Sequence, residues 1–130
     1  MTRIIIAALV LMAILLPLGE GAFAGTERYF CEYRVHASPD GLKETNDFRL
    51  EFVIDGTTGK AVIIGNNGLE TVAVVREARA ITFLEALASG AVQSTTIVLD
   101  TMETVHSRHS ILLSDLVPSQ YYGQCKVLKK

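Results

Sequence analysis

Apolar residues recur at every second position through most of the chain beyond residue 25. The clearest segment, Phe48–Ile54, reads Phe-Arg-Leu-Glu-Phe-Val-Ile, with apolar side chains at its even positions and the charged Arg49 and Glu51 at odd ones. A period of two is typical of a β-strand that buries one face and exposes the other. The same alternation returns along the chain, so the pattern predicts a succession of strands.

Turn-forming residues divide this pattern into eight predicted strands. Asn66-Asn67-Gly68 is the strongest hairpin signal, because asparagine and glycine tolerate the positive φ angles that tight hairpins require. We expect longer irregular segments at Ala37–Asp47 and Leu113–Gln120, and Leu84–Ser89 has room for a short helical end. The predicted strands are Arg28–His36, Phe48–Ile54, Lys60–Gly65, Thr71–Arg76, Ala80–Ala86, Ala91–Leu99, Thr104–Leu112 and Tyr121–Leu128.

The short connections between these strands indicate how the strands are joined. Parallel strands need crossover connections of about a dozen residues or more, which most of these intervals do not provide. The sequence therefore predicts an all-β fold, an antiparallel meander of about eight strands, closed into a barrel in preference to a two-sheet sandwich. Cys31 and Cys125 lie in the first and last strands, which are neighbours only in a closed meander, so a disulfide between them favours the barrel.

The beginning of the chain differs in character from the remainder. Arg3 supplies a positive charge, Ile4–Leu16 is an uninterrupted apolar run, and Ala22-Phe23-Ala24 offers small residues for cleavage. This order is typical of a secretory signal peptide, and the run is short of the ~20 residues that cross a bilayer. We expect a signal peptide at residues 1–24 and one β domain at 25–130, periplasmic or secreted, with no membrane anchor after cleavage.

Composition and cysteine content support that division. The chain is 49% apolar with a net charge of −2, and the apolar excess is concentrated in the predicted signal peptide. Such a charge balance gives no basic surface for nucleic acid. Two cysteines in an exported domain favour a structural disulfide, worth ~4–5 kcal/mol in the chain-entropy model. His106 and His109, three apart on a strand, point to opposite faces, so we expect neither a metal nor another cofactor.

Polar residues concentrate on the sixth and seventh predicted strands. A four-residue turn at Asp100–Glu103 would place Ser94 opposite His109 and Thr96 opposite Ser107. A second four-residue turn at residues 87–90 would put these four side chains on the interior face. We expect them either to form the polar part of a ligand pocket or to satisfy one another by hydrogen bonds across the strands.

The same two strands carry two further interpretations. His106 and Arg108 project from the other face, where we expect either a solvated surface or a site for an anionic ligand or an acidic partner. A catalytic arrangement of Ser94, His109 and Glu85 is disfavoured. Glu85 and His109 would lie two strands apart, about 10 Å, which is too far for the hydrogen bond that such a site needs. The sequence therefore predicts binding without catalysis.

One loop supplies an alternative class of function. Ala88–Ala91 reads Ala-Ser-Gly-Ala, and with Cys31, Cys125 and a small β-barrel it is similar to periplasmic inhibitors of c-type lysozyme. The resemblance implies a protein-interaction module whose serine-glycine-alanine loop enters a lysozyme cleft. In that family basic and tyrosine residues continue the loop, whereas Val92 and Gln93 follow here.

Two functions are therefore expected of this domain. The first is an exported barrel that binds a small molecule or an envelope component through Ser94, Thr96, Ser107 and His109. The alternative is a module that contacts an envelope protein through Ser89 and Gly90, or through His106 and Arg108. An interior cavity would favour the first, and a filled interior with a protruding 87–91 loop would favour the second.

Overall fold

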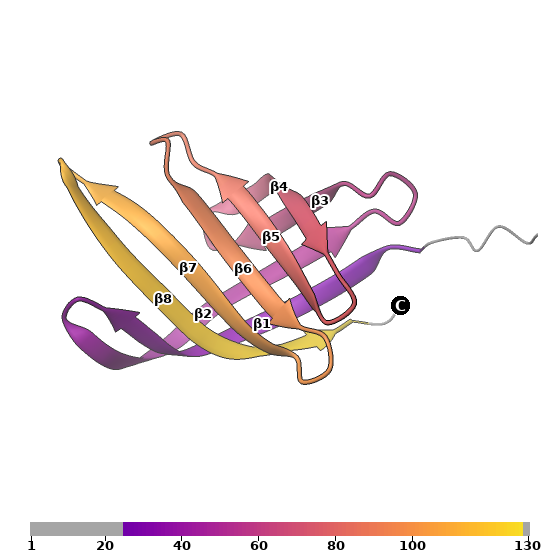
Figure 1. Cartoon of the computed structure of the whole chain (residues 1–130), viewed down its shortest axis with the longest axis horizontal. Coiled ribbons are helices and arrows are strands. Elements are labelled where there is room, and N and C mark those ends of the chain that lie inside the picture. The colour runs from indigo at the N-terminus through magenta and orange to yellow at the C-terminus, as the bar shows by residue number, and fades with distance from the viewer. Residues whose placement is uncertain (1–24, 129–130) are drawn as a thin grey trace, which may run out of the picture.

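Eight antiparallel strands follow one another in chain order around a closed barrel (Figure 1). The computed structural model describes residues 25–128, and the predicted signal peptide lies outside the described residues. Among residues 25–128 there is no helix, 74% of these residues are in strands, and the expected barrel is confirmed over the sandwich. The strands are β1 (Glu27–Ser38), β2 (Gly41–Ile54), β3 (Ala61–Gly65), β4 (Gly68–Arg76), β5 (Ala80–Ala86), β6 (Val92–Val98), β7 (Glu103–Leu112) and β8 (Asp115–Val127).

The barrel closes where β1 pairs with β8. Cys31 and Cys125 are directly opposite one another in this pairing, with their Cα atoms 4.0 Å apart, and they form a disulfide. The predicted bond between the first and last strands is therefore confirmed. None of the residues that the structure describes forms a helix with the length and apolarity needed to cross a bilayer.

Several strands are longer than the alternation predicted. Most of Ala37–Asp47 and of Leu113–Gln120 belongs to β1, β2 and β8, and the possible helical end at Leu84–Ser89 begins as the last residues of β5. The hairpins β1–β2 and β7–β8 extend beyond the shorter strands β3 to β6, toward the left of Figure 1. The ends of these two hairpins leave the barrel wall and therefore bury no continuous face. For that reason the period-two alternation of apolar residues does not reveal these parts of the strands.

The apolar core fills one part of the barrel. Phe52 and Phe83 stack at its centre with ring centroids 4.2 Å apart, and both are fully buried. In the clearest predicted strand Leu50, Phe52 and Ile54 are buried as expected, and Phe48 is partly buried. The core comprises Tyr29, Cys31, Tyr33, Leu50, Phe52, Ile54, Ala61, Ile63, Val72, Ile81, Phe83, Ile97 and Cys125.

Candidate functional site

The inner and outer faces of β6 and β7 are the reverse of the sequence prediction. The connection between Ala86 and Val92 has five residues instead of four, and Phe83 pairs with Thr95. A shift of one residue moves every side chain of a strand to the opposite face. Residues Ser94, Thr96, Ser107 and His109 consequently point away from the barrel interior, and their expected interior placement is wrong.

These four residues do not surround a common site. Ser94 pairs with Ser107 instead of His109, and His109 pairs with Pro118 in an exposed position. Thr96 Oγ1 lies 2.8 Å from Thr82 Oγ1, while Ser107 accepts a hydrogen bond from Gln120 Nε2 at 3.3 Å. The hydroxyls of Thr96 and Ser107 therefore bond to Thr82 and Gln120 of neighbouring strands, and not to other members of the predicted set of four.

His106 lies inside the barrel, so its predicted exposure is also wrong. Its side chain is 1% exposed, and Nδ1 lies 2.7 Å from the hydroxyl oxygen of Thr95. Burial, together with the nearby positive charge of Arg108, lowers the pKa of His106 to about 4. The imidazole is therefore neutral at pH 7, and it contributes hydrogen-bonding capacity without charge.

Arg108 is half-buried next to an aromatic cluster. Its guanidinium carbon lies 5.8 Å from the ring centroid of Tyr121, which in turn packs 4.4 Å from Phe48. The Nε–H of Arg108 is buried and has no hydrogen-bond partner. An unmet buried donor on a charged group costs free energy of the order of 1–3 kcal/mol, so Arg108 is prepared to bind an acceptor.

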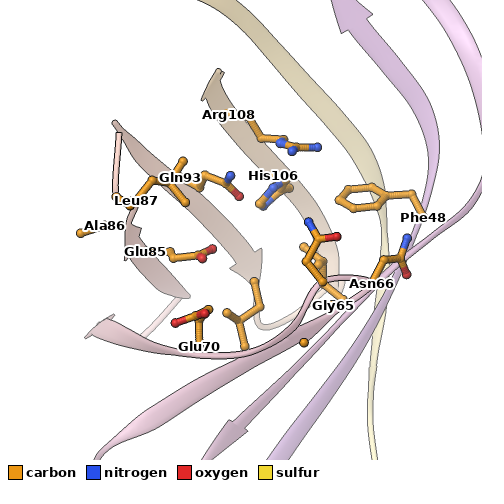
Figure 2. A pocket seen from close by; sticks show the side chains of 15 residues that line it. Phe48, Gly65, Asn66, Glu70, Glu85, Ala86, Leu87, Gln93, His106 and Arg108 are labelled. Carbon is orange, nitrogen blue, oxygen red and sulfur yellow. The ribbon is translucent and has the colours of Figure 1, made fainter. Parts of the chain in front are cut away.

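A cavity of about 460 Å³ occupies the barrel beside His106 and Arg108 (Figure 2), and we call it the mouth cavity. It opens at the end of the barrel formed by the β3–β4 turn and the β5–β6 loop. Phe48, Leu50 and Ile63 supply apolar wall, and Gln93 supplies an amide. Its remaining lining residues are Gly65, Asn66, Asn67, Gly68, Glu70, Glu85, Ala86, Leu87, Ala88, His106 and Arg108.

Three charged side chains share the mouth cavity without pairing with one another. None of the ion pairs found among residues 25–128 involves Glu70, Glu85 or Arg108. Burial raises the pKa of Glu85, repulsion from Glu70 raises it further, and attraction to Arg108 opposes both effects. Figure 2 shows Arg108 and Glu70 on opposite sides, with Gln93, His106 and Glu85 between them.

Glu70 and Gln93 were missed as site residues, although the sequence contained a signal for both. Glu70 lies two residues before the buried Val72, and Gln93 lies two before the buried Thr95. The side chain of each residue therefore lies on the same face of its strand as a buried side chain. Nothing in the local sequence shows that the β3–β4 turn at Asn66 comes close to either of them.

The predicted contact loop is exposed. Ser89 and Gly90 lie in the β5–β6 loop, next to Leu87 and Ala88, which line the mouth cavity.

Comparisons of the chain with protein-family models, with curated proteins and with solved structures find no match.

Proposed function

We propose that this protein is a non-catalytic binding protein that holds a small polar molecule in the mouth cavity. The observation that carries the proposal is Arg108, whose buried Nε–H has no partner although the side chain lines an open cavity. A ligand acceptor would satisfy this donor. Cavities of about 300–1,000 Å³ with apolar walls and a few polar groups are typical of small-molecule sites.

The proposal includes export from the cytoplasm. The Cys31–Cys125 disulfide is compatible with an oxidising compartment, since such bonds persist mainly in secreted and periplasmic proteins. Residues 1–24 would then serve as a signal peptide, and a domain beginning at Gly25 would function in the periplasm or outside the cell. The ligand would accordingly be a molecule that reaches that compartment.

Native mass spectrometry of the exported protein tests this function. We expect a mature chain beginning at Gly25, two hydrogens lighter than the reduced form, together with a retained small molecule that denaturation releases. Ala88→Trp places a large side chain at the opening of the mouth cavity and should abolish the retained mass. Ala78→Trp, in the exposed loop between β4 and β5 at the opposite end of the barrel, is the matched control.

Two results would contradict the proposal. One is equal retention of the molecule by both tryptophan variants, because the ligand would then lie elsewhere. The other is a protein that leaves the exporting cell without any bound molecule and gains none from a concentrated extract of small molecules from the same compartment. Thermal unfolding of both variants shows whether Ala88→Trp remains folded.

A second candidate function, contact with an envelope protein, is favoured by the tip of the β7–β8 hairpin. Leu113 is 103% exposed there, and Ile111, Leu112 and Leu116 are exposed beside it. Exposed apolar groups of this kind often mark interaction sites.

The lysozyme-inhibitor alternative would instead use the Ser89-Gly90 loop. Inhibition of a c-type lysozyme by the purified protein, lost in Gly90→Trp but retained in Leu113→Asp, would favour that loop, and no inhibition at micromolar concentrations would exclude it.

A further inference from the structure

We infer that the ligand of the mouth cavity is a zwitterion, with its anionic group at Arg108 and its ammonium group at Glu70 and Glu85. This inference rests on the proposed function and specifies the class of molecule that the site accepts. It follows from the arrangement of one cation and two carboxylates in a single cavity with no ion pair between them.

The anionic end is assigned to Arg108. A guanidinium presents its N–H groups in a planar fork that matches the two oxygens of a carboxylate. In the mouth cavity this group is held beside the ring of Tyr121, and its Nε–H is still without a partner. The neighbouring imidazole of His106 is neutral at pH 7, so Arg108 supplies the positive charge on this side.

The cationic end is assigned to the two glutamates. Glu70 comes from β4 and Glu85 from β5, two strands that pair with one another. Their carboxylates are close enough for mutual repulsion to raise the pKa of Glu85. An ammonium group placed between them would relieve that repulsion and would favour the ionised form of Glu85.

The middle of the mouth cavity suits the backbone of such a ligand. Gln93 and His106 lie between the charged walls, and Phe48 and Leu87 provide apolar surface (Figure 2). Because His106 Nδ1 is engaged with Thr95, Nε2 is the ring nitrogen left for a bound molecule. A ligand with only an anionic group would leave the carboxylates of Glu70 and Glu85 without a cationic partner. A ligand with only a cationic group would leave Arg108 without an anionic partner.

Three probes of equal chain length test the assignment: 6-aminohexanoate, hexanoate and hexylammonium. Their dissociation constants for the folded protein are measured by titration calorimetry or ligand-detected NMR. We expect 6-aminohexanoate to bind at least ~10-fold more tightly than either singly charged probe, the change that one charge-assisted hydrogen bond would provide. The dissociation constants of the shorter 4-aminobutanoate and the longer 8-aminooctanoate show which ligand length best spans the distance between Arg108 and the two glutamates.

Charge-removing variants locate each end of the ligand. In Arg108→Gln, 6-aminohexanoate should lose its advantage over hexylammonium, whereas in the double variant Glu70→Gln/Glu85→Gln it should lose its advantage over hexanoate. Arg79→Gln and Glu77→Gln change the same residue types in the exposed loop between β4 and β5, and they should leave all affinities unchanged. A thermal unfolding curve for each variant shows that the barrel remains folded.

The outcomes separate this inference from the function on which it rests. Equal affinity for 6-aminohexanoate and hexanoate, or for 6-aminohexanoate and hexylammonium, overturns the zwitterion assignment. So does the absence of binding for amino acids of all three lengths. In either case a molecule retained by the unmodified protein and lost in Ala88→Trp would still establish the mouth cavity as a binding site.

Discussion

Thr95 and His106 face one another inside the barrel, with the threonine hydroxyl oxygen 2.7 Å from the imidazole Nδ1. Both side chains are 1% exposed. This pair joins β6 to β7 at the wall of the mouth cavity and orients the ring of His106. It also places a titratable group where burial disfavours its charged form.

The stability of the domain should depend on pH through His106. Its pKa is about 4 in the folded protein against an ordinary value of 6.5, so between these values the unfolded chain binds a proton that the folded chain does not. The contribution of His106 to stability is therefore fully present above pH 6.5 and is lost as the pH decreases toward 4, by about 3 kcal/mol. Urea unfolding between pH 7.5 and 4 measures this change. His106→Gln should lose that component, whereas His109→Gln, on the outer face, should retain it.

Two neighbouring threonines should respond differently to the same substitution. Thr95→Val removes the hydroxyl and leaves His106 Nδ1 buried without its partner, which should cost about 1–3 kcal/mol. Thr96→Val is on the outer face and loses only its contact with Thr82, so it should cost about 1 kcal/mol or less. Denaturant unfolding at pH 7.5 checks both. A larger loss in Thr96→Val than in Thr95→Val would contradict the observed faces of β6.

Gly123 should tolerate no side chain. It pairs with Tyr33 of β1 where the register shifts, and a Cβ there would overlap the carbonyl oxygen of Glu32 and lie 2.8 Å from the Cα of Tyr33. Because those atoms are backbone, relief requires movement of the strand. Gly123→Ala should therefore destabilise the domain by about 3 kcal/mol or more, measured as the free energy of unfolding. Gly25→Ala, in open space, should leave stability unchanged.

The tip of the β7–β8 hairpin should be easy to stabilise. Leu113 has φ of 60°, a left-handed conformation that costs a residue with a branched side chain about 1–2 kcal/mol. Its side chain is fully exposed and gains no packing in return. Leu113→Gly should therefore raise the free energy of unfolding by about 1 kcal/mol, as a denaturant titration would show. A decrease would mean that Leu113 makes contacts that stabilise the folded state.

The candidate site was predictable only in part. Parity correctly placed His106 and Arg108 on the same face of their strand, and it separated them from Ser94 and His109. Which group faces the interior depended on the length of the β5–β6 loop. A four-residue loop and a five-residue loop fit the same sequence, and they reverse the faces of the strands that follow.

The sequence by itself determined the class of the fold, the number of strands and the disulfide. Period-two alternation and frequent turn residues are local properties, and Cys31 and Cys125 are the only two cysteines in the chain. The tertiary structure alone decided the register between neighbouring strands and the gathering of Glu70, Glu85 and Arg108 around one cavity. Register depends on packing and hydrogen bonding across strands, which the local alternation of a single strand does not specify.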